Sequence, residues 1–115
     1  MPAQGLYTSG AISADEATNI VMRLPEFRRF AAQVEESGGG AVHAAARTDR
    51  QEPAGNGTRA AWIVQVFENH PDHAVTWNWF YVELDTGAVL VADAVTGDAV
   101  PLAAWRLKDG RGAEP

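Results

Sequence analysis

The sequence predicts an α+β domain, in which an N-terminal helix, kinked or broken at Pro25, packs on a four- to five-stranded antiparallel meander sheet. Two observations predict this class. Apolar residues recur at helical spacing up to residue 36, and they alternate with a period of two after residue 59. A helical segment followed by a run of strands is typical of one helical layer on one sheet. At 115 residues the chain has room for one such core.

The helical segment is expected over residues 14–36. Ser13 and Glu16 have capping-box spacing, at which each side chain satisfies a backbone N–H of the other residue. Pro25 predicts a kink or the start of a second helix, because it has no N–H to donate. Residues 38–40, Gly-Gly-Gly, are a helix stop. The apolar stripe between these signals consists of Ala17, Ile20, Val21, Leu24, Phe27, Phe30, Ala31 and Val34.

The period-two region predicts strands joined by short turns. Residues 49–58, DRQEPAGNGT, predict a polar loop, and residues 85–87, Asp-Thr-Gly, predict a hairpin turn. The expected strands cover residues 41–48, 60–68, 75–84, 88–93 and 99–105. The expected domain organisation is a flexible arm at 1–12, one α+β domain at 13–108 and a flexible tail at 109–115.

Folding the hairpins symmetrically, the first of them about Pro71, predicts a sheet that is apolar on both faces. The first face collects Trp62, Val64, Val66, Thr76, Asn78, Phe80, Val82, Leu84, Ala88, Leu90 and Ala92. The second face collects Ile63, Gln65, Phe67, Val75, Trp77, Trp79, Tyr81, Glu83, Val89, Val91 and Asp93. One helical layer covers only one face, so the other is expected to be available to a partner or a second copy of the chain.

The second face carries the aromatic residues that typically anchor interfaces, because each combines a large apolar ring with, in Trp and Tyr, a polar edge. The predicted partner-binding residues on this face are Phe67, Trp77, Trp79 and Tyr81. The alternative is that the tryptophans pack in the core beneath the helix, leaving the first face outside.

A second candidate site is the turn His70-Pro71-Asp72-His73, with Glu68 just upstream. Imidazoles and carboxylates are ligands that zinc or nickel accepts, and a His–Asp pair can act as an acid–base dyad. A proline turn does not place both rings on one helical face, however, and a third ligand has to come from elsewhere. We therefore predict no metal, no cofactor and no catalytic residue, and we assign His70 and His73 to the rim of the partner-binding surface.

Composition excludes several classes of function. The net charge of −6 opposes binding to a phosphate backbone, so nucleic acid is not an expected partner. The absence of cysteine excludes disulfides and thiolate sites. No apolar run is long enough to insert into a membrane, and no signal peptide is visible at the N-terminus. The compartment stays open: cytoplasmic as the sequence stands, or periplasmic or secreted if a leader was removed.

Several segments together resemble the PepSY-like, cystatin-like small bacterial domains. They are Glu16-Ala17, Ile20-Val21, Leu24-Pro25-Glu26, Trp62 to Glu68, His70 to His73, Tyr81 to Gly87 and Val95 to Asp98. The resemblance implies a helix resting on a curved antiparallel sheet and a binding or regulatory role without catalysis. Such domains are often exported and linked to protease inhibition or cell-envelope regulation. Two alternatives remain: an immunity protein that neutralises a bacterial toxin, and a small metal-binding or enzymatic domain centred on His70, Asp72 and His73.

Overall fold

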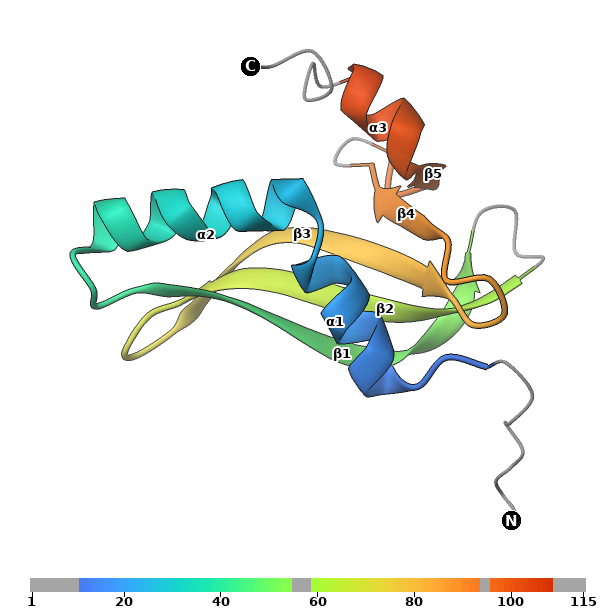
Figure 1. Cartoon of the computed structure of the whole chain (residues 1–115), viewed down its shortest axis with the longest axis horizontal. Coiled ribbons are helices and arrows are strands. Elements are labelled where there is room, and N and C mark those ends of the chain that lie inside the picture. The colour runs from blue at the N-terminus through green and yellow to red at the C-terminus, as the bar shows by residue number, and fades with distance from the viewer. Residues whose placement is uncertain (1–10, 55–58, 94–95, 109–115) are drawn as a thin grey trace.

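The fold is known from a computed structural model, which describes residues 11–54, 59–93 and 96–108 (Figure 1). Two helices precede a five-stranded antiparallel sheet, and a third helix follows it. The predicted α+β class, with N-terminal helices packed on a meander sheet, is therefore confirmed. The predicted tail at 109–115 and residues 1–10 of the predicted arm lie outside the described residues.

The N-terminal helical segment consists of two helices, α1 (Ala14–Met22) and α2 (Pro25–Gly38). The capping box is present: the Glu16 N–H donates to Ser13 Oγ at 3.1 Å, and the Ser13 N–H donates to Glu16 Oε1 at 2.9 Å. Pro25 starts the second helix, where its missing N–H costs nothing. Gly39 ends that helix with a φ of 61°, in the left-handed region that glycine tolerates.

The sheet has the strand order β1-β2-β3-β4-β5, so each strand pairs with its neighbour in sequence. The strands are β1 (His43–Ala54), β2 (Arg59–Asn69), β3 (Ala74–Glu83), β4 (Val89–Ala92) and β5 (Ala99–Pro101). The predicted loop over residues 49–58 is wrong for residues 49–54, which continue β1 along the edge of the sheet. Polar residues are tolerated there because an edge strand needs backbone pairing on one side only.

The last predicted strand, residues 99–105, is wrong beyond Pro101, where helix α3 (Leu102–Lys108) begins. Proline cannot donate to the β ladder, so it ends the strand, and it also fits just before the start of a helix. Trp105 consequently reaches the core from a helix and is 4% exposed. An ion pair with a buried carboxylate attaches α3 to α2: Arg106 Nε and Nη2 donate to the two carboxylate oxygens of Glu26 at 2.5 and 3.0 Å.

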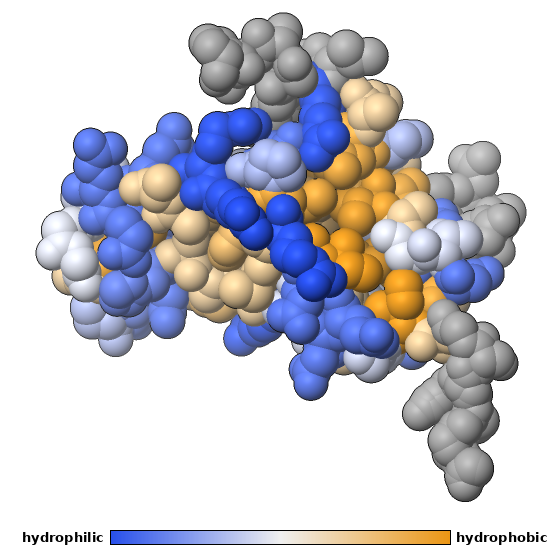
Figure 2. Space-filling model, viewed as in Figure 1, coloured by the Kyte–Doolittle hydropathy of each residue, from blue (hydrophilic) through white to orange (hydrophobic). Residues whose placement is uncertain are grey.

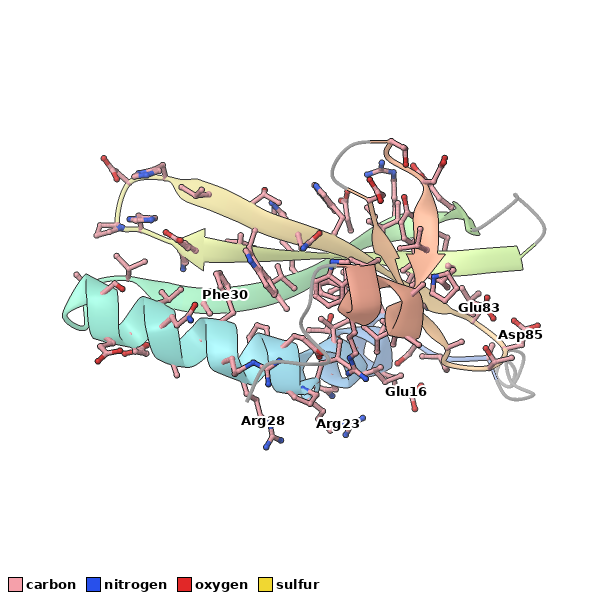
Figure 3. All side chains as sticks on the ribbon, turned by 90° about the horizontal axis from the view of Figure 1, so that it is seen from above. Glu16, Arg23, Arg28, Phe30, Glu83 and Asp85 are labelled. Carbon is pink, nitrogen blue, oxygen red and sulfur yellow. The ribbon has the colours of Figure 1, made fainter. Side chains whose placement is uncertain are left out.

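All three helices lie on one face of the sheet (Figures 1 and 3). We call this the helix face. Its centre is an aromatic cluster of Phe30, Trp77, Phe80 and Trp105. Phe30 points from α2 toward the sheet (Figure 3) and stacks on Trp77, with ring centroids 4.4 Å apart and planes 8° from parallel. Trp105 meets Phe80 edge-on at 5.8 Å. The helix face therefore holds the main hydrophobic core.

A β-bulge in β3 changes the predicted distribution of the tryptophans. Up to Val66 the two faces of β2 and β3 follow the prediction, but the register differs by two residues. Gln65 pairs with Trp79 and Val66 with Asn78, whereas folding about Pro71 predicts Trp77 and Thr76 as their partners. Phe67 then pairs with Thr76, which leaves Trp77 as the extra residue on the bulged strand. The bulge turns the Trp77 ring onto Phe30. The prediction that Trp77 shares a face with Trp79 is therefore wrong.

The hairpin between β3 and β4 also differs from the prediction. Phe80 pairs with Val91 and Val82 pairs with Val89, so both valines of β4 belong to the helix face. Leu90 pairs with Tyr81 and lies on the opposite face. The predicted faces of β4 are therefore exchanged. The cause is the turn over residues 84–87, which is closed by the hydrogen bond from the Glu83 N–H to the Ala88 carbonyl. This closure shifts the pairing of β4 with β3 by one residue, which moves each β4 side chain to the other face.

The chain just before α1 is anchored to the sheet. The Ile12 N–H donates to the Leu84 carbonyl at 2.9 Å, and the Trp62 indole N–H donates to the Ile12 carbonyl at 2.6 Å. Ile12, which the prediction assigned to the flexible arm, is therefore held against the sheet. No helix in the described part of the chain is long and apolar enough to cross a membrane.

Candidate functional site

The candidate site is the face of the sheet that no helix covers, which we call the open face. It is defined by Ile63, Gln65 and Phe67 of β2 and by Trp79 and Tyr81 of β3. It is hidden in Figure 2, which shows the side that carries the helices. On that visible side hydrophilic residues cover α2, and hydrophobic ones gather between α1 and α3 (Figure 2). On the open face, by contrast, the side chains of the strands themselves form the surface, because no helix covers them.

A polar network orders the middle of the open face. Gln65 is 8% exposed although it has no helix above it, because the large side chains around it exclude water. It accepts a hydrogen bond from Arg47 Nε at 2.9 Å and donates to Thr76 Oγ1 at 2.7 Å. The Arg47 guanidinium lies 5.4 Å from the ring centroid of Phe67. Such a cation–π contact holds the Phe67 ring in place.

A groove of about 460 Å³ runs along the same face beside this network. Its apolar wall includes Ile63, Trp77, Trp79 and Tyr81, and Arg50 lines it from the edge strand. Arg50 pairs with Glu52 at 2.8 Å and with Asp49, so one cation faces two carboxylates and this side of the groove stays acidic. Residues 92, 93 and 97 close the opposite side. A volume of this size is in the range of pockets that bind small molecules or peptide side chains.

Two polar groups on the open face have no hydrogen-bond partner among the described residues: the indole N–H of Trp79 and the hydroxyl of Tyr81. The tryptophan at position 62, by comparison, donates to a backbone carbonyl. Buried indoles and phenols normally find a partner, whereas partly exposed ones are satisfied by water or by a bound molecule. Trp79 and Tyr81 are both partly exposed. They are therefore available as donors to a ligand seated in the groove.

The predicted binding residues are thus divided between two places. Phe67, Trp79 and Tyr81 share the open face, as predicted, while Trp77 stacks on Phe30 at the helix-face core and also lines the groove. The contribution of Arg47 and its partners was not predicted from the sequence. A signal for it was present in Gln65, a polar residue inside the apolar stretch WIVQVF, because a polar side chain in such a strand needs a hydrogen-bond partner.

His70 and His73 lie at the end of the β2–β3 hairpin. Their rings stack with centroids 4.4 Å apart and planes 12° from parallel. His70 Nε2 bonds to Glu68 Oε1 at 2.9 Å, and His73 Nδ1 bonds to Asp72 Oδ1 at 2.6 Å. The hydrogen bond from His73 holds the pKa of the Asp72 carboxyl below its usual value. Each ring is therefore engaged by its own carboxylate, and within the described ranges no three His, Asp or Glu residues are placed to hold a metal ion.

Comparison with known proteins identified no relative of this chain. No protein-family model matches the chain, and neither a curated protein nor a solved structure matches it.

Proposed function

We propose that the chain is a non-enzymatic binding domain of the PepSY-like, cystatin-like kind that holds a protein or peptide on the open face. The observation that carries the proposal is the pair Trp79 and Tyr81. Both rings border the groove, and neither polar edge has a partner among the described residues. Residues of these two types supply much of the binding energy at protein interfaces, because they bury a large apolar area and also donate hydrogen bonds.

The polar network beside the groove supports the same proposal. Gln65 fixes Arg47, and Arg47 in turn fixes Phe67, so the part of the open face next to the groove is ordered before a ligand arrives. Preorganised side chains lose little conformational entropy on binding, which leaves more of the interaction energy for affinity. The surface therefore suits one defined partner segment better than a range of unrelated ones.

The charge of the chain narrows the chemistry of the partner. A net charge of −6 attracts a basic protein and raises its association rate. This charge also favours the second candidate function, an immunity protein that neutralises a basic bacterial toxin. A toxin gene directly upstream of the gene for this chain favours immunity. An export signal in the full gene favours the PepSY-like role.

A peptide-display selection against the whole chain tests the proposal. We expect selected peptides to lose about tenfold or more in affinity for Trp79→Ala. A central aromatic anchor typically contributes about 2 kcal/mol or more to the binding free energy. Tyr81→Phe removes only the hydroxyl, and we expect a smaller loss. Arg28→Ala is the matched control, since Arg28 points away from the sheet on the helix side (Figure 3). Peptides that bind wild type and Trp79→Ala equally well contradict the proposal.

The same variants test self-association through the open face. Sedimentation velocity of the wild-type chain over a range of concentrations reports whether a homodimer forms. If one forms through this face, Trp79→Ala shifts it to monomer while Arg28→Ala leaves it unchanged.

A further inference from the structure

A second cavity lies on the helix side of the molecule, between the C-terminal half of α2 and the end of the β2–β3 hairpin. Its volume is about 310 Å³. Phe30, Val34 and Val42 give it apolar walls, and Glu68 and His70 line it from the sheet side. It shares no lining residue with the groove on the open face. It is therefore a separate site, and the proposed function does not use it.

The apolar walls are firmly built. Phe30 and Val34 belong to the hydrophobic core and are 7% and 6% exposed. Val42 is held against the end of α2 by the absence of a side chain at Gly38, where an added Cβ would lie 2.8 Å from the Val42 Cβ. The cavity is thus bounded by rigid side chains on two sides. A slot of this kind suits an unbranched hydrocarbon segment.

The charged groups around the cavity are mostly acidic. The Glu68 carboxylate lines it and is hydrogen-bonded to His70, which carries charge only when protonated. The last turn of α2 contains no basic residue, and the sequence there carries Glu35 and Glu36. Of these two, Glu35 bonds to His43 at 2.6 Å. The helix C-terminus adds partial negative charge from its free carbonyl groups, which normally attract a cation. The local field therefore favours a positively charged ligand.

We propose that this cavity binds a primary alkylammonium group. The methylene chain lies between Phe30, Val34 and Val42, and the ammonium donates a charge-assisted hydrogen bond to Glu68. A carboxylate of equal length is rejected, because it faces the Glu68 charge. An alcohol of equal length fills the slot but loses the ionic contact. The chemistry is shared by free aliphatic amines and by the side chain of lysine.

Titration of the whole chain at neutral pH tests the proposal, with hexylamine, hexan-1-ol and hexanoate as probes of equal chain length. Methyl NMR signals of Val34 and Val42 report occupancy of the cavity. We expect hexylamine to shift both signals, with an affinity about tenfold or more above that of the alcohol, because a hydrogen bond to a charged group is the stronger kind. Hexanoate is expected to leave them unchanged. Equal affinity for amine and alcohol overturns the proposal, as does the absence of any shift.

Two variants separate the ionic contact from nonspecific attraction to an acidic protein. Glu68→Gln removes the charge at the cavity and should reduce hexylamine affinity about tenfold. Its side chain is 37% exposed, so the fold tolerates the change. Glu52→Gln removes one negative charge on the open face and should have no effect. Equal effects of the two variants overturn the proposal.

A last titration distinguishes a lysine side chain of a protein from a free aliphatic amine as the ligand. Nα-acetyl-lysine-N-methylamide carries the same group on a peptide unit. Shifts of Val34 and Val42 with this probe show that a lysine of a protein is accommodated, and shifts with hexylamine alone restrict the site to free amines. Because this site and the open face share no residues, Glu68→Gln leaves peptide binding at the open face intact, and Trp79→Ala leaves amine binding intact.

Discussion

The helix face and the open face contrast most sharply at two tryptophans that lie two residues apart in β3. Trp77 stacks on Phe30 at 4.4 Å and contacts two further aromatic rings, so it joins α2, β3 and α3 into one core. Trp79 lies opposite Gln65 on the open face and borders the groove. The bulge at Trp77 separates their roles. One extra residue in a strand thus decides which aromatic ring stabilises the fold and which one is offered to a partner.

The largest expected effect is a difference in stability between Trp77→Ala and Trp79→Ala. The first variant removes the central ring of the aromatic cluster, and we expect it to lower the free energy of unfolding by about 3 kcal/mol. The second removes a ring from a surface groove and should cost less than about 1 kcal/mol. Urea unfolding followed by circular dichroism measures both. Equal losses in the two variants contradict the division between the faces.

A smaller effect is expected at Glu26, whose buried carboxylate joins α2 to α3 on the helix face through Arg106. Glu26→Gln removes the charge and should destabilise the chain by about 2 kcal/mol at neutral pH, since hydrogen bonds between charged groups are the stronger ones. Glu36→Gln, at an exposed position of the same helix, is the matched control and should change little.

The Glu26 pair also predicts a pH dependence. Burial raises the pKa of this carboxyl, but the hydrogen bonds and charge of Arg106 outweigh burial, so the pKa lies below its usual value. A group whose pKa is lower in the folded state contributes stability above its unfolded pKa and loses that stability as the pH falls through the folded one. Between about pH 5 and about pH 3 the wild-type chain should therefore lose more stability than Glu26→Gln. Parallel pH profiles of the two proteins contradict this assignment.

A still smaller effect is expected on the open face, at Gln65. Its two hydrogen bonds order Arg47 and Thr76 without closing a core above them. Gln65→Leu should cost about 1 kcal/mol or less, because the two partners remain close enough to the surface to bond to water. It should nevertheless weaken a peptide bound at the groove, since Arg47 and Phe67 lose their fixed positions. Thr76→Val removes only one of the two bonds and should have about half the effect on stability.

Local signals in the sequence were sufficient for the fold class. The capping box at Ser13, the proline that starts α2 and the glycine that ends it act within a few residues, and all three are present. The shared face of Gln65 and Trp79 also followed from simple alternation. These features depend on neighbours in the chain, and the sequence carries them directly.

The predictions that proved wrong concern features that depend on contacts between residues distant in the sequence. Strict alternation in TWNWFY contains no sign of a bulge, because the bulge is stabilised by Phe30 of a helix more than forty residues away. The β3–β4 register depends on how the Asp-Thr-Gly turn closes, and α3 depends on Trp105 packing against Phe80. Consequently Phe67, Trp79 and Tyr81 were placed on the correct face, while Trp77 was not.

Both tryptophans line the groove, but Trp77 is held in the aromatic cluster, so Trp79 is the one whose ring and N–H are offered to a partner. The most direct test is nitrogen-15 NMR of the indole N–H groups in the presence of a soluble paramagnetic gadolinium complex. The Trp79 signal should broaden most, since its N–H has no partner among the described residues, while Trp105, which is 4% exposed, should broaden least. A protected Trp79 signal, or a Trp77 signal that broadens as strongly, would contradict the account.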